Sequence, residues 1–81
     1  MTFKPTNQQI AIDTANNVYA QKSIRIFNDG GTGLCSLKYS NNTTYSTFLM
    51  FAGQSVFIEK ATSDKVEGTD MYAVPVVNYK W

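Results

Sequence analysis

The sequence predicts a small all-β domain, a β-sandwich or partly open barrel of about six to seven short antiparallel strands. Several short segments alternate apolar and polar residues, which is typical of strands that bury one face. Turn-forming residues separate these segments at intervals of roughly ten residues, a spacing that favours sandwiches and barrels. With 81 residues, the chain has the length of one domain with a modest core.

Residues 1–9 are polar, contain Pro5, and are expected to form an extended arm before a single domain over residues 10–81. Two isoleucines alternate within residues 10–12, so a short edge strand is predicted there. This strand would be the first element of the sandwich.

A helix over residues 8–20 competes with this strand, because its alanine and valine residues approximate helical spacing. Thr14, Asn16 and Asn17 are poor helix formers and favour the strand. The two asparagines predict a turn, and residues 18–20 are expected to form a further short strand.

The clearest strand covers residues 23–28 and ends at the glycine-rich turn of residues 29–33. Alternation resumes over residues 34–40, where Cys35, Leu37 and Tyr39 share one face. The polar residues 41–44 that follow have the composition of a loop.

The centre of the chain, residues 48–60, is predicted to form a β-hairpin. Its arms, residues 45–51 and 54–60, are rich in β-branched and aromatic residues. Gly53 lies between them and is expected to take a positive φ at the reversal.

Residues 61–67 are polar and predict a turn, and residues 71–80 predict the last strand. Pro75 lies inside this strand, so the strand is expected to be an edge there or to carry a bulge. The predicted core consists of aliphatic residues from these strands: Ile24, Ile26, Leu37, Val56, Ile58, Val74 and Val76.

Composition restricts the classes of function. A net charge of +1 gives no general attraction to nucleic acid, membranes or acidic substrates. Only 16% of residues are charged and 14% are aromatic, which suits permanent association better than free diffusion. The single cysteine cannot form an internal disulfide and favours a reducing compartment. We expect a soluble protein made in a cytoplasm, because the sequence lacks a signal-like or membrane-spanning apolar run.

No catalytic, cofactor or metal site is predicted. The sequence has no histidine, which excludes His-based triads and most zinc sites. Cys35 has no activating partner in the sequence and is expected in the core. The six carboxylates lie mostly in predicted turns, and nothing pairs them as in a glycosidase. Residues 29–33 lack the lysine and the helix of a phosphate-binding loop, and two Asn-x-Thr matches over residues 41–44 lie in a polar loop without a secretory signal.

Aromatic residues at the chain ends and beside the strands are the candidates for partner binding. Stacking on sugars or single-stranded nucleic acid is an alternative, but basic residues are not interleaved with them. A protein interface is favoured, because Tyr, Trp and Phe are enriched there. The predicted partner-binding residues are Phe3, Pro5, Tyr45, Phe51, Tyr79 and Trp81.

Four segments form a recognisable order along the chain. Residues 23–30 read S-I-R-I-F-N-D-G, a strand that closes on Asn and Gly. Residues 51–60 read F-A-G-Q-S-V-F-I-E-K, an Ala-Gly-Gln turn followed by a strand that ends in Glu-Lys. Residues 63–66 supply a short polar turn, and residues 73–76 a valine-rich last strand. Together these segments resemble small structural virion proteins of tailed bacteriophages, particularly marine phages.

The resemblance implies a non-enzymatic structural protein without catalytic residues. In this class, capsid-bound members are decoration or cement proteins, so the expected partner is the major capsid protein or another virion subunit. The expected location is the capsid surface, after assembly in the host bacterial cytoplasm, and a homo-oligomer is possible. A tail or fibre attachment module that binds carbohydrate is the main alternative, and a host-directed enzyme or inhibitor is a third.

Overall fold

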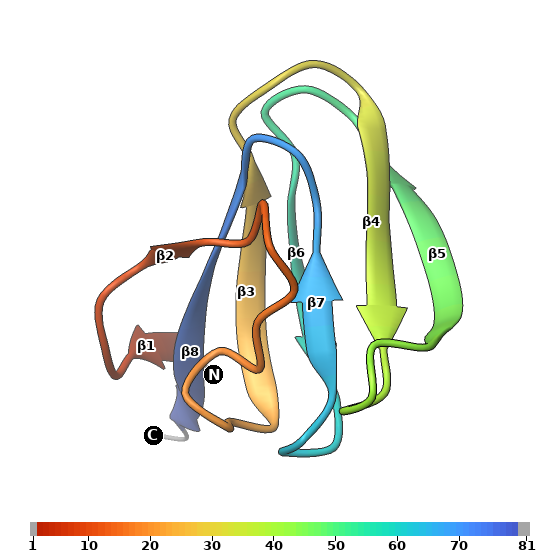
Figure 1. Cartoon of the computed structure of the whole chain (residues 1–81). Coiled ribbons are helices and arrows are strands. Elements are labelled where there is room, and N and C mark those ends of the chain that lie inside the picture. Colours follow the sequence, from red (N-terminus) through yellow and green to blue (C-terminus); the bar gives the residue numbers. More distant parts are fainter. Residues whose placement is uncertain (1, 80–81) are drawn as a thin grey trace.

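The computed structural model describes residues 2–79, which form an all-β sandwich of two antiparallel sheets and contain no helix (Figure 1). The fold class expected from the alternating pattern is therefore confirmed. The strands are β1 (Thr2–Pro5), β2 (Ile10–Ala11), β3 (Ser23–Asn28), β4 (Gly33–Lys38), β5 (Thr44–Met50), β6 (Ser55–Glu59), β7 (Lys65–Glu67) and β8 (Met71–Tyr79).

The larger sheet has the order β1–β8–β3–β6, and β2 pairs with β8 beyond the end of β1. The smaller sheet has the order β5–β4–β7. In Figure 1, β4 and β5 lie on one side of the molecule, and β1, β2 and β8 lie on the other. An isolated bridge between Asn16 and Val66 ties the segment after β2 to the smaller sheet.

Apolar side chains from both sheets meet between them. The fully buried cluster consists of Ile12, Val18, Ile24, Ile26, Cys35, Met50, Val66, Met71 and Ala73. Among the residues predicted for the core, Ile24 and Ile26 belong to this cluster. Leu37, Val56 and Ile58 are partly buried and pack against it.

Val74 and Val76 are buried, as the sequence predicts, but they lie outside the cluster between the two sheets. In the β3–β8 ladder, Ile26 lies opposite Ala73 and Ile24 lies opposite Pro75. Ala73 and Pro75 therefore share the core face with the two isoleucines. Alternation along the strand places Val74 and Val76 on the outer face, although both side chains are buried there.

The predicted central hairpin is also wrong, although its two arms are strands. β5 pairs with β4 and β6 pairs with β3, so residues 51–54 cross from one sheet to the other. Gly53 has φ +77°, as expected, and the Gln54 N–H donates to the Phe51 carbonyl at 3.0 Å. This geometry is a type II turn, whose twist does not favour a tight two-residue hairpin.

The segment after β2 forms neither the competing helix nor the short strand expected at residues 18–20. Val18, Tyr19 and Ala20 have φ of 54°, 59° and 54° and form a left-handed turn. The side-chain oxygens of Asn16 and Asn17 accept hydrogen bonds from the Val18 and Ala20 amides at 2.7 and 3.2 Å. Burial of Val18 and these bonds offset the steric cost of the left-handed backbone.

Pro75 lies in a central strand rather than at a sheet edge. The Thr6 N–H donates to the Pro75 carbonyl at 3.0 Å, so the proline nitrogen also faces the β1–β2 side. The ladder on that side is interrupted between residues 6 and 10. The N–H that Pro75 lacks would point toward this gap between β1 and β2. The proline therefore removes no hydrogen bond from the ladder.

Asn28 is fully buried at the end of β3, where three chain crossings between the sheets meet. Its side-chain nitrogen donates to the carbonyls of Gly31, Met50 and Phe51 at 2.9, 3.1 and 3.2 Å. Its side-chain oxygen accepts the Gly30 N–H at 3.0 Å. One amide therefore satisfies backbone groups of the crossings at residues 29–32 and 51–54.

The third crossing, residues 68–70, contacts the first crossing just after Asn28. The Asp29 N–H donates to the Asp70 carbonyl at 2.9 Å. A Cβ at Gly30 would lie 2.7 Å from the Asp70 Cβ, so only glycine allows this approach without a shift.

Replacing Asn28 with leucine should lower the free energy of unfolding by roughly 2–4 kcal/mol, because the buried carbonyls lose their donor. Asn41→Ala is the matched control, since Asn41 also bonds a backbone amide but is exposed. Urea denaturation measures both. Equal losses in the two variants would contradict the role assigned to Asn28.

Gly53→Val should lower the unfolding free energy by about 1–3 kcal/mol, because a β-branched residue is strained at positive φ. No atom lies within 4 Å of the expected Cβ, so the cost is conformational and not steric contact. Gly53→Asn should cost clearly less, since asparagine tolerates this region. Identical melting temperatures for the two variants would argue against the turn.

Candidate protein-binding surface

The predicted partner-binding residues lie in two separate regions. Pro5 is exposed in β1 of the larger sheet. Tyr45 and Phe51 lie in β5 and in the turn after it, and are 39% and 60% exposed. The backbones of Phe3 and Tyr79 belong to β1 and β8, but their side chains lie outside the described structure, as does Trp81.

Exposed apolar side chains are concentrated on the β4–β5 hairpin and the turn after it. This group, here called the hairpin surface, holds five of the eight large hydrophobic residues found exposed among those described. Its members are Leu34, Tyr39, Tyr45, Leu49 and Phe51. A segment of 18 residues thus carries most of the large exposed hydrophobic side chains among the described residues, so these side chains are clustered and not scattered singly over the surface.

Leu34 and Leu49 lie directly opposite each other in the β4–β5 ladder and are 59% and 50% exposed. The next pair along the ladder, Cys35 and Phe48, faces the core. The two leucines therefore stand on the outer face of the smaller sheet as direct neighbours across the strands.

Tyr39 and Tyr45 form an aromatic pair at the other end of the hairpin. Their ring centroids lie 4.5 Å apart with an interplanar angle of 33°. The Tyr45 hydroxyl donates to the Asp64 carboxylate at 2.8 Å. Desolvation raises the pKa of Tyr45, and the bond to Asp64 and its charge add to this shift. The two rings are thus held in place while remaining exposed, as interface aromatics often are.

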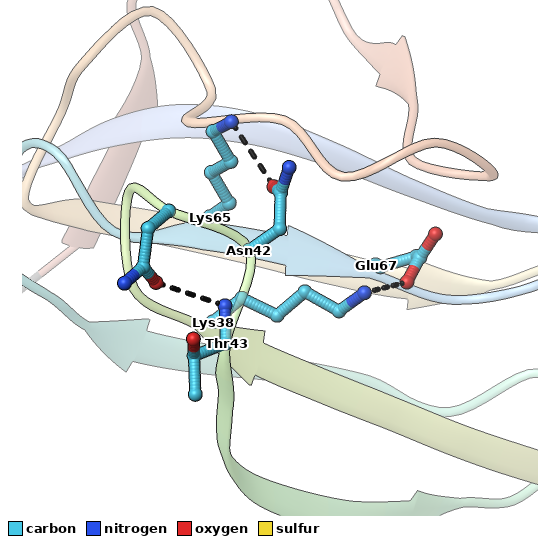
Figure 2. A network of polar contacts seen from close by, with 6 residues as sticks. Lys38, Asn42, Thr43, Lys65 and Glu67 are labelled. Carbon is cyan, nitrogen blue, oxygen red and sulfur yellow. Dashed lines mark hydrogen bonds and ion pairs between the residues drawn. The ribbon is translucent and has the colours of Figure 1, made fainter.

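A polar network fixes the loop that joins β4 and β5, as Figure 2 shows. Lys38 forms an ion pair with Glu67, and Lys65 donates to the Asn42 side chain at 3.1 Å. The loop itself is a tight turn in which Asn42 has φ 70° and donates its N–H to the Tyr39 carbonyl. These contacts link β4 and its loop to β7 and so hold the strands that carry the hairpin surface in place.

A second feature lies on the outer face of the larger sheet. It is a hollow of about 330 Å³ lined by Gln9, Arg25, Phe27, Asp29 and Tyr72. Arg25 donates to the Ser55 hydroxyl at 2.8 Å, and its guanidinium lies 5.8 Å from the centroid of the Phe27 ring. The hollow therefore combines aromatic faces with charged and amide groups.

Leu34, Leu49 and Tyr39 were not among the predicted partner-binding residues. Leu34 shares strand parity with Ser36 and Lys38, which is a signal for an outward face. Tyr39 was expected on the face of Cys35, but it begins the loop after β4 and is 51% exposed.

Cys35 lies in the core, as the sequence predicted, and burial raises the pKa of its thiol from 9.0 to about 11. Among the described residues, no group of three His, Cys, Asp or Glu side chains could hold a metal ion. The described part of the chain has no helix long and apolar enough to span a membrane.

Comparisons with protein-family models, with curated proteins and with solved structures found no match for this chain.

The raised pKa of Cys35 makes the stability of the fold dependent on pH. The folded state holds this proton more tightly than the unfolded state, so the contribution is present below about pH 9 and is lost as pH rises through about 11. The melting temperature of the wild type should therefore fall more steeply over this range than that of Cys35→Val. Parallel pH profiles would contradict this prediction.

Proposed function

We propose that this chain is a non-enzymatic structural protein of a bacteriophage virion, which decorates the capsid and stabilises the head by binding the major capsid protein. The observation that carries the proposal is the concentration of exposed apolar side chains on the hairpin surface. The resemblance of four sequence segments to small virion proteins supplies the biological setting.

The hairpin surface has properties that suit a protein partner. Tyr and Phe are enriched at interfaces, because they offer large contact areas with little conformational entropy to lose. Strand pairing and the contacts to Asp64 and β7 already hold the side chains in place, so little ordering is required on binding. A surface that adds area between capsid subunits needs this combination of rigidity and apolar contact.

The termini take a smaller part in this proposal than the sequence predicted. Residues 2–5 pair with β8 instead of extending away from the domain. Deleting residues 1–6 would therefore remove β1 and uncover the edge of β8, so particle binding and folding would change together. Point substitutions on the hairpin surface avoid this problem.

The test is the occupancy of purified phage particles by a Leu34→Ser, Leu49→Ser double variant. We expect occupancy to fall about tenfold or more, because two apolar anchors are lost from the interface. The particles should also release their DNA at lower temperature than the wild type. The variant should remain folded, since both leucines are half exposed.

Phe57→Ser is the matched control. Phe57 lies in the larger sheet and is 49% exposed, close to the 50% of Leu49. Full occupancy and unchanged heat release by the double variant would exclude the hairpin surface as the capsid contact. Absence of the wild-type protein from purified particles would exclude the virion function.

The hollow at Arg25 and Tyr72 favours a second candidate function, a tail or fibre attachment module that binds carbohydrate. Sugars stack on aromatic faces and bond to charged and amide side chains, and this site offers both. Labelling the protein on intact particles separates the two functions, because one places it on the head and the other on the tail.

A further inference from the structure

Strand β5 is an open edge of the smaller sheet: among the described residues, it pairs with β4 alone. It is seven residues long, Thr44–Met50, and its sequence T-Y-S-T-F-L-M contains no charged residue and no proline. Natural proteins usually protect such edges with charges, proline, short length or bulges. A bulge at Tyr45 interrupts the ladder near the start of β5, but residues 46–50 pair regularly.

The other sheet edges are protected in ways that β5 is not. β7 has only three residues, two of them charged, and Val66 in its middle already pairs with Asn16. β6 ends in Glu59, and β1 contains a lysine and Pro5. Among the described edge strands, β5 is therefore the longest and has neither a charge nor a proline.

The pairing pattern shows which backbone groups of β5 face the open edge. Val66 exchanges both of its backbone hydrogen bonds with Asn16, so its backbone points away from β4. Val66 lies opposite Leu37, whose backbone therefore points toward β5.

Alternation then directs the backbones of Leu34 and Ser36 away from β5. Their partners Leu49 and Thr47 consequently direct their N–H and C=O groups to the open edge. These are the groups that a further strand would pair with.

We propose that β5 pairs in antiparallel fashion with β5 of a second copy of this chain, with Thr47 on the two-fold axis. The two smaller sheets would join into one continuous sheet of six strands. Thr47 would exchange its N–H and C=O bonds with Thr47 of the second copy, and the paired segment would extend on each side of the axis as far as the bulge at Tyr45.

This register is self-complementary. It sets Ser46 of each copy opposite Phe48 of the other, and all of these residues lie in the regularly paired part of β5. Because β5 carries no charge, no like charges meet across the axis. A single strand pair buries little area, so the dissociation constant should lie in the micromolar range or above.

The inference concerns association of the purified protein in solution and does not depend on the proposed function. The hairpin surface would bind through exposed side chains, whereas this contact uses the backbone edge of β5. If the protein dimerises in solution but is missing from purified particles, the virion function is excluded and the proposed dimer is not.

Sedimentation equilibrium of the full chain from micromolar to millimolar concentration tests the dimer. We expect the wild type to dimerise, and Thr47→Pro to remain monomeric because it lacks the N–H on the axis. The folded monomer does not use that N–H, so the variant should keep its β-type circular dichroism. Thr47→Lys is a second variant in which two positive charges would meet on the axis, and Thr14→Lys is its matched control.

Hydrogen exchange at increasing protein concentration tests the register. Exchange at Thr47 should slow by about tenfold or more as dimer forms, while Ser46 and Phe48 are already protected by β4. A wild-type protein that stays monomeric at millimolar concentration would overturn the proposal. So would a dimer that persists in both Thr47→Lys and Thr47→Pro.

Discussion

The buried amide of Asn28 is the interaction on which the arrangement of the two sheets depends. Chain crossings carry backbone carbonyls that neither ladder can satisfy, and such groups are costly when buried. Asn28 donates to three of them and accepts from one amide, so a single side chain holds two crossings together. This contact fixes how the smaller sheet lies over the larger one, and with it which faces of β4 and β5 stay exposed.

The positions of most strands could be predicted from the sequence, but β1 and β7 were expected as an arm and a turn, and some strand partners could not be predicted. Period-two alternation located residues 23–28 correctly, because half-buried strands show that pattern whatever they pair with. The hairpin at Gly53 failed because two adjacent strands need not share a sheet. Ala52 before Gly53 argues for a type II turn, since alanine does not readily take a positive φ. The Ala-Gly pair was therefore a signal against a tight hairpin. The alternation of the two arms gives no information on the type of turn between them.

Prediction of the exposed apolar residues was partial for a related reason. Tyr45 and Phe51 were recognised as exposed aromatics from their place beside the core strands. Leu34 and Leu49 were missed because a leucine in a strand is usually assigned to the core. Their exposure follows from pairing with each other on the outer face, a fact of register that the sequence does not state. The left-handed turn at Val18 was beyond prediction, since a β-branched residue rarely adopts it.

The central place of β8 has a consequence for biosynthesis. Residues 71–79 pair with β1, β2 and β3, so they join segments that leave the ribosome much earlier. Until they emerge, the nascent chain can form the local β4–β5 hairpin but cannot close the larger sheet. During that interval β3 presents an apolar strand with one open edge. Completion of the domain is therefore a late event that follows synthesis of residue 79.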